Sequence, residues 1–198
     1  TMGSQPPEGA ISLFNGKATE LFKSAKVTES GLMMEGTETR DAYTSFGLHL
    51  EFRLPFMPYA RGQGRANSGV YLQSRYEVQI LDSFGLAGKN NECGGLYHYV
   101  EPSTNMCLPP LSWQTYDIEL TAAAFDTAGK KTRNARLTVR HNGVLVHDDV
   151  EVERKTGAGK PEGVLALPTK FQNHGNPVRF RNIWLVDRSP KPQAVTAR

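Results

Sequence analysis

The chain has 198 residues, of which 38% are hydrophobic and 22% are charged, and its formal net charge is +3. This length is enough for one domain with its own hydrophobic core. The small net charge, on scattered basic residues, argues against nucleic-acid binding. No apolar stretch approaches the roughly 20 residues that a membrane helix needs, so we expect no membrane span. The oligomeric state stays open.

The first ten residues, TMGSQPPEGA, have neither the basic start nor the apolar stretch of a signal peptide. We interpret residues 1–10 as an extended leader, either a cleaved mature end or a cloning remnant. If it is a cleaved mature end, a signal peptide has already been removed.

Short runs with period-two alternation, separated by Gly, Asn and Pro, predict β-strands. No apolar stripe with a helical period extends beyond ten residues. The expected fold is an all-β, antiparallel β-sandwich formed by one domain, 11–187, followed by a tail, 188–198. In chain order, strands are expected at 11–16, 32–38, 46–54, 67–73, 76–83, 113–122, 135–141, 144–148, 164–167 and 178–186.

The segment 67–83, NSGVYLQSRYEVQILDS, predicts a β-hairpin with one apolar face. The opposite face gathers a tyrosine, two amides and a carboxylate: Tyr71, Gln73, Glu77 and Gln79. Such a surface can hydrogen-bond a polyhydroxylated ligand, although an ordinary solvated sheet face is an equally good interpretation.

Two glycine-containing stretches have a weak likeness to phosphate loops. No helix pattern follows RGQGR (61–65), and Pro161 stands in TGAGKP (156–161) where Ser or Thr should hold magnesium. A mobile loop is the better interpretation of the first, and the second is discarded.

A long segment, 84–111, contains both cysteines and little periodicity. A disulfide between Cys93 and Cys107 would pin this loop, contributing about 3 kcal/mol, and would favour an oxidising compartment. A metal site is the alternative, with His98 as a third ligand, but no CxxC spacing supports it.

Several motifs occur together: FNGK (14–17), LEFR (50–53), NSGVYLQ (67–73), YEVQILDS (76–83), GGLY (94–97), WQTYDI (113–118), HNGV (141–144) and NHGNPVRFRNIWL (173–185). In this order and spacing they resemble the 3-keto-disaccharide hydrolase family, formerly catalogued as a domain of unknown function. The resemblance implies a concanavalin A-like jelly roll, a periplasmic or extracellular location, and action on sugars oxidised at C3. The sequence departs from the family at Asn173, where many members have Asp, and at LPTKF (167–171).

A 3-keto sugar needs a base near C2, a group that stabilises the enolate, and an acid at the leaving group. The catalytic candidates are Glu77 or His174 as the base and Asp82 as the acid, with Arg53 or Arg181 at the enolate. The expected substrate-binding residues are Glu51, Arg53, Tyr71, Gln73, Gln79 and Arg181.

Each assignment has a structural alternative. The arginines could simply pair with Glu51 or Glu77, His174 could cap its turn, and Asp82 could end its strand. No cofactor is required by the sequence, although a bound calcium or other divalent ion stays open.

The first hypothesis is therefore a hydrolase-type enzyme that cleaves 3-keto glycosides or disaccharides by elimination and water addition. The alternative is a non-catalytic carbohydrate-binding module of the same fold. The predicted face is rich in Glu, Gln and Arg and poor in aromatic residues, which favours the enzyme. Either hypothesis expects an oligosaccharide or a 3-keto sugar as the ligand.

Overall fold

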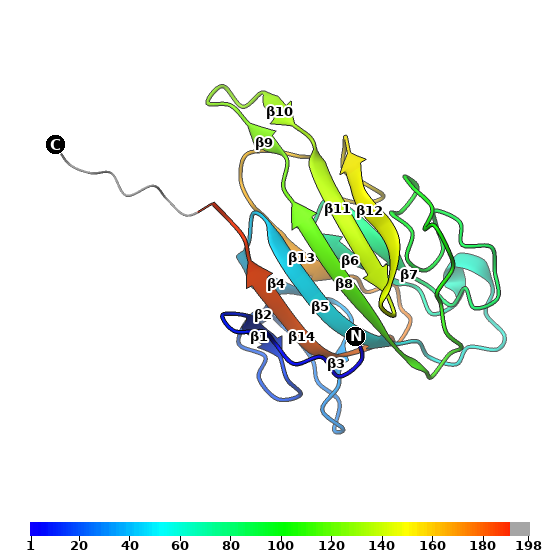
Figure 1. Cartoon of the computed structure of the whole chain (residues 1–198). Helices are drawn as coiled ribbons and strands as arrows, with labels where there is room; N and C mark the ends of the chain where they lie inside the picture. Colours follow the sequence, from blue (N-terminus) through cyan, green and yellow to red (C-terminus); the bar gives the residue numbers. More distant parts are fainter. Residues whose placement is uncertain (191–198) are drawn as a thin grey trace.

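The computed structural model describes residues 1–190 (Figure 1). Two antiparallel sheets pack face to face, and in this part of the chain the 3-10 turn η1 (Gly62–Gly64) is the one helical element. No helix among these residues is long and apolar enough to cross a membrane. The predicted all-β jelly-roll sandwich is confirmed. Of the predicted tail, 188–198, the part beyond Pro190 lies outside the described residues.

The seven-stranded sheet has the order β1-β14-β5-β8-β11-β12, and β3 also pairs with β14. It is the layer nearest the viewer in Figure 1. Its strands are β1 (Ile11–Phe14), β3 (Met33–Met34), β5 (Phe46–Arg53), β8 (Trp113–Thr121), β11 (Ala135–His141), β12 (Val144–Val152) and β14 (Arg179–Asp187).

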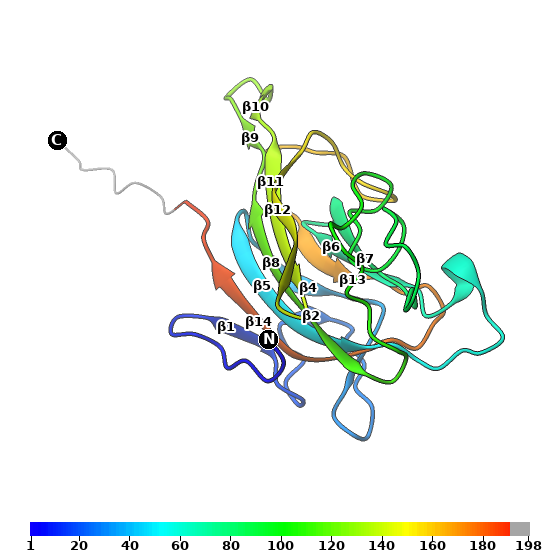
Figure 2. The same ribbon diagram turned by 45° about the vertical axis from the view of Figure 1, so that its right-hand side comes forward.

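The five-stranded sheet lies behind the first, and Figure 2 shows the two as separate layers. Its order is β2-β4-β13-β6-β7, so β7 is an edge strand. Its strands are β2 (Phe22–Lys23), β4 (Thr37–Ala42), β6 (Ser68–Leu72), β7 (Tyr76–Ile80) and β13 (Pro168–Phe171); β9 (Ala124–Phe125) and β10 (Lys131–Arg133) form a separate ribbon.

The core fills the space between the sheets. The seven-stranded sheet contributes Leu50 and Phe52, and the five-stranded sheet contributes Val70 and Val78, all of them fully buried. Phe171 and Phe180 join the two layers with ring centroids 5.1 Å apart. Because successive side chains alternate between faces, the polar residues between these apolar ones lie on the two outer faces of the sandwich.

Most predicted strands are confirmed within a few residues, and the structure differs from the prediction in three ways. Residues 164–167 lie in a loop with Val164 and Leu165 exposed, and the strand follows at β13. The expected strand 32–38 is divided, because Gly36 adopts a φ of +90° between β3 and β4. The short strands β2, β9 and β10 were not predicted, since two or three residues show no periodicity.

The expected disulfide is wrong, because Cys93 and Cys107 are free, buried thiols. Hydrogen bonds hold the long loop instead. The Cys93 sulfur lies 3.2 Å from the Tyr116 hydroxyl, which donates to the Gln79 carbonyl at 2.6 Å. The Asn105 side chain donates to two carbonyls of the 83–86 turn. Burial in this apolar environment raises the pKa of the Cys93 thiol.

Candidate active site

A row of polar side chains crosses the outer face of the five-stranded sheet, with one residue from each strand. Neighbours in the row are cross-strand partners in the β-ladder, so their side chains lie on the same face. The row runs from β2 to β7 as Lys23, Glu38, Lys170, Tyr71 and Glu77. Four inter-strand spacings of ~4.8 Å give it a length of about 19 Å.

The long loop after β7 completes the sheet edge and brings a second tyrosine to the row. Residues 94–97 run beside β7, where Gln79 exchanges backbone hydrogen bonds with Gly94 and Gly95, and the Tyr97 N–H donates to the Glu77 carbonyl. The Tyr97 side chain therefore lies beside Glu77. This pairing also covers the edge strand, which would otherwise expose unpaired backbone groups.

A covering loop, residues 153–167, lies over the same face. The Thr156 hydroxyl accepts a hydrogen bond from the Glu77 N–H at 2.7 Å, and the Lys160 N–H donates to the Ser74 carbonyl at 2.8 Å. Arg75 is buried and donates to the Pro161 and Leu165 carbonyls of the loop. The loop is thus anchored to the β6–β7 turn at several points.

The sheet and the covering loop enclose a polar cavity of about 200 Å³. At ~30 Å³ per water this equals about seven waters, which suits one monosaccharide ring. Two further cavities, of about 260 and 400 Å³, continue along the row toward β2 and share lining residues with their neighbours. We call the 200 Å³ cavity the first cavity and the 260 Å³ cavity the second. The first cavity is lined by Asn67, Tyr71, Glu77, Gln79, Tyr97, Ala158, Gln172 and His174.

Two glycines leave the space that the Glu77 carboxyl group occupies. A Cβ on Gly69 would lie 2.3 Å from Glu77 Oε1, and a Cβ on Gly157 would lie 2.7 Å from Glu77 Oε2. Burial raises the pKa of Glu77 from 4.5 to about 7, although a hydrogen bond from Tyr71 and the charge of Lys170 act in the opposite direction. Glu77 is therefore divided between acid and base forms near neutral pH.

Three acceptor atoms around this cavity have no hydrogen-bond donor among the described residues. They are Glu77 Oε2, Gln79 Oε1 and Gln172 Oε1, all buried from solvent. A buried polar atom without a partner costs about 1–3 kcal/mol. The same three residues line the cavity, so donors from a bound molecule or from water would complete their hydrogen bonding.

Of the residues proposed from the sequence, Tyr71, Glu77, Gln79 and His174 come together at the cavity. Gln73 does not, since it lies in the β6–β7 turn and donates to the Tyr43 and Thr44 carbonyls.

Asp82 is also absent from the cavity lining. It follows β7 and pairs with Arg65 at 3.1 Å, which ties the 55–66 loop to the sheet. The expected acid at the leaving group is therefore held in a structural ion pair.

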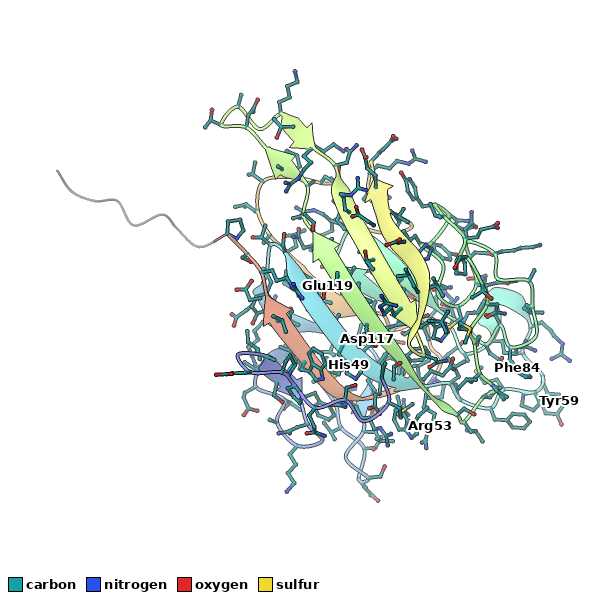
Figure 3. The ribbon with its side chains drawn as sticks, in the orientation of Figure 1. His49, Arg53, Tyr59, Phe84, Asp117 and Glu119 are labelled. Atoms are coloured by element: carbon teal, nitrogen blue, oxygen red, sulfur yellow. The ribbon has the colours of Figure 1, made fainter. Side chains whose placement is uncertain are left out.

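The structure separates Glu51, Arg53 and Arg181 from Glu77 by the full thickness of the sandwich. All three are on the outer face of the seven-stranded sheet, and Figure 3 shows Arg53 there beside β5 and β8. The alternation correctly predicts which face of its own strand each residue occupies. However, β5 and β14 belong to the seven-stranded sheet, whereas β7, which carries Glu77, belongs to the five-stranded sheet. These three residues do not contribute to the cavity at Glu77.

They belong to a second polar cluster. Glu51 pairs with Arg181 at 2.6 Å and accepts a hydrogen bond from Asn182, which a β-bulge in β14 turns outward at a φ of +44°. His49 Nδ1 lies 2.6 Å from Asp117 Oδ1, and Figure 3 shows these two side chains next to each other.

Residues 1–4, from the expected leader, cover this cluster. The Gly3 N–H donates to Glu51 at 2.6 Å, and the Ser4 carbonyl accepts hydrogen bonds from Asn182 and Trp184. The carboxylates of the cluster are therefore fully engaged.

Several cavity residues were not singled out from the sequence. Asn67 and Tyr97 lie inside motifs that were noted, and the Gln63 side chain receives hydrogen bonds from Asn67 and Gln79. Gln63 belongs to the RGQGR stretch interpreted as a mobile loop. Lys170 lies on β13 and Gln172 follows it. The sequence predicted this strand at 164–167, four residues too early.

The atoms at the cavity that could ligate a metal ion include carboxylate and amide oxygens. No group of three or more His, Cys, Asp and Glu side chains that could hold a metal ion occurs within residues 1–190.

Two antiparallel sheets with a carboxylate-bearing polar groove on one outer face define a jelly-roll domain of the concanavalin A-like class. Residues 9–186 match the family described as 3-keto-alpha-glucoside-1,2-lyase-like domain. The chain belongs to this family, as the motifs in its sequence indicated.

Solved structures from Parabacteroides distasonis ATCC 8503 have the same fold. One, described as a "putative glycosyl hydrolase", is 29% identical, with a TM-score of 0.83 over 91% of this chain and 84% of that one. Two others with the same description are 19% and 21% identical, with TM-scores of 0.62 and 0.59; each alignment spans 91% of this chain and 94% or 99% of the other. No curated protein matches the chain in sequence.

Proposed function

We propose that this protein cleaves 3-keto glycosides by removing the proton on C2, with Glu77 as the base. The observation that carries the proposal is the cavity itself. A carboxyl group with a pKa of about 7 lies next to three acceptor atoms that lack donors. Sugar hydroxyl groups supply donors of this kind, and membership of the family favours a 3-keto sugar as the substrate.

The chemistry balances as an elimination followed by water addition. Glu77 takes the proton from C2, which the neighbouring ketone makes acidic, and the electron pair forms an enolate with C3. The enolate then expels the C1 substituent, whose oxygen leaves with the bonding pair and takes up a proton. Water adds its oxygen at C1 and a proton at C2, and the net reaction is hydrolysis. An enzyme that stops before this step is a lyase.

The cavity residues divide these tasks by position. Tyr71 and Tyr97 both line the cavity beside Glu77. Tyr71 donates to the Glu77 carboxyl group and so positions the base, whereas the Tyr97 hydroxyl donates to Gln63 at 3.4 Å and can turn from this long hydrogen bond to the ketone oxygen. Gln79 and Gln172 present acceptors for the ring hydroxyls. His174 is exposed on the rim of the cavity, where it can supply a proton to the departing oxygen.

Proton NMR in deuterated water tests the proposal, with a 3-keto glucoside and the matching unoxidised glucoside as substrates. We expect release of the aglycone and deuterium at C2 of the keto sugar alone. The Glu77→Gln variant should lose both, while Glu51→Gln, which removes a carboxylate from the opposite face, should retain them.

Undiminished exchange at C2 by Glu77→Gln would overturn the role of Glu77. If wild-type protein leaves both sugars intact but broadens their signals, the domain binds carbohydrate without cleaving it.

A further inference from the structure

The second cavity along the row directly adjoins the proposed reaction site. Its volume is about 260 Å³, and it shares Tyr71, Ala158 and Gln172 with the first cavity. A molecule longer than one ring, with its reacting ring in the first cavity, can therefore extend into the second. The residues that line the second cavity would then contact the part of the substrate beyond that ring.

This cavity carries more positive than negative charge. Lys160 and Lys170 line it together with Glu38. The Glu38 carboxylate is already paired with Lys23 of β2 at 2.9 Å. Neither Lys160 nor Lys170 has an acidic partner within ion-pair distance among the described residues.

The cross-strand pairing fixes the position of Lys170 in the row of polar side chains. It lies between Glu38 and Tyr71, and its Nζ is 5.8 Å from the centre of the Tyr71 ring. A cation over an aromatic face is attracted to it, which holds the ammonium group over the groove. Lys160 is brought to the same cavity by the covering loop, whose backbone is anchored at Ser74.

The two cavities thus suit ligand groups of different kinds: hydrogen-bond donors in the first and acceptors in the second. The first presents acceptor atoms without donors, which suit hydroxyl groups, whereas the second presents ammonium groups, which have donors and no acceptor. A neutral sugar would leave the charge of both lysines to solvent. An anionic group would meet two cations in one cavity.

We propose that the second cavity selects substrates carrying an anionic group, a carboxylate or a phosphate, beyond the reacting sugar. The inference rests on the proposed function, because it assumes that the reacting sugar binds in the first cavity. Lys160 and Lys170 are then specificity residues. Exposed ion pairs contribute about 0.2–1 kcal/mol each, so together they amount to a factor of about 2 to 30 in affinity.

The kinetic test compares 3-keto glucosides of 4-hydroxybenzoate and of its neutral analogue 4-hydroxybenzamide. We expect a lower KM for the carboxylate substrate at about 20 mM ionic strength and a reduced advantage at about 300 mM. The advantage should disappear in the double variant Lys160→Met/Lys170→Met. Lys130→Met, which removes an exposed lysine from the distant β9–β10 connection, should keep it. A phosphorylated aryl glucoside in parallel separates phosphate from carboxylate preference.

A binding measurement separates this inference from the proposed reaction. Calorimetry with the unoxidised 4-carboxyphenyl and 4-carbamoylphenyl glucosides needs no turnover. Tighter binding of the carboxylate, lost in the double variant, supports the inference even if neither keto glucoside is cleaved. Equal affinities, including no measurable binding of either, together with equal KM values overturn it while leaving any observed cleavage intact.

Discussion

On the outer face of the five-stranded sheet, Glu77 is 2% exposed, and one of its carboxylate oxygens has no donor among the described residues. On the outer face of the seven-stranded sheet, Glu51 is 1% exposed and accepts hydrogen bonds from Arg181, Asn182 and the Gly3 N–H. Burial raises the pKa of Glu77 to about 7. Burial acts on Glu51 in the same direction, but its hydrogen bonds outweigh that effect and lower its pKa.

The difference lies in which donors the chain supplies. Asp117 repeats the pattern of Glu51, because burial raises its pKa but hydrogen bonds from His49 and Thr1 bring it below the usual value. The seven-stranded face satisfies its own carboxylates, which stabilises the fold. The five-stranded face leaves acceptors open, which is expected where a ligand completes the hydrogen bonding.

Replacing Glu77 by Gln gives the largest expected effect on activity. Loss of a general base lowers the rate by about 10²–10⁴-fold, measured as kcat/KM on a 3-keto glucoside. Wild-type kcat/KM should rise with pH through about 7, because the carboxylate is the active form.

The free energy of unfolding should fall with pH over the range in which kcat/KM rises. Glu77 titrates near 4.5 when unfolded and near 7 when folded, so wild-type stability falls between these pH values and then levels off. A shift of this size corresponds to about 3 kcal/mol, at ~1.4 kcal/mol per pH unit. Glu77→Gln should lack this fall in urea unfolding measured from pH 4 to 8; an unchanged pH dependence would contradict the raised pKa.

Gly157→Ala should close the space beside Glu77. The added methyl would lie 2.7 Å from Glu77 Oε2 and 2.8 Å from Tyr97 Cδ1, at a φ of +49° that side chains rarely adopt. We expect at least a tenfold loss in kcat/KM, since a displacement of about 1 Å at a reacting group can cost 10²-fold. Gly163→Ala, in the same covering loop with no atom closer than 3.8 Å, is the matched control and should retain activity.

Glu51→Gln should affect stability and spare activity. Hydrogen bonds to charged groups contribute about 1.5–3 kcal/mol, so we expect a loss of about 2 kcal/mol in the free energy of unfolding at pH 7. Because the folded pKa of Glu51 is lowered, its stabilisation is present above the unfolded pKa and is lost as pH falls through the folded one. Wild type and variant should therefore converge in acid. A large fall in kcat/KM at unchanged stability would show that this face contributes to catalysis.

The sequence predicted the sandwich because its strands alternate strongly. In β5 the inward Leu48, Leu50 and Phe52 are separated by polar residues, and the observed strand matches the predicted one within one residue. By contrast, β4 is a polar strand, TETRDA, which buries only Thr37 and Thr39 and carries no apolar pattern to find.

The site was predicted in part, for a related reason. Tyr71, Glu77 and Gln79 belong to one hairpin, and local alternation is enough to place them together. Whether the strands of Glu51 (β5) and Arg181 (β14) join the same sheet as this hairpin depends on long-range pairing, which alternation does not encode. Tyr97 reaches the cavity from one loop, and Gln63 of another loop accepts hydrogen bonds from the cavity residues Asn67 and Gln79; neither arrangement has a sequence period.

The smallest expected effect comes from Lys170→Met, which removes a positive charge near Glu77. That charge opposes the effect of burial, so its loss should raise the pKa of Glu77 further. For a surface charge in high effective dielectric, we expect the midpoint of the kcat/KM profile on a neutral 3-keto glucoside to move to higher pH by about half a unit. Lys23→Met is the matched control, because Lys23 lies at the far end of the row and already pairs with Glu38. An equal shift in both variants would attribute the change to net charge, whereas a shift in Lys170→Met alone would show that the row tunes the carboxyl group locally.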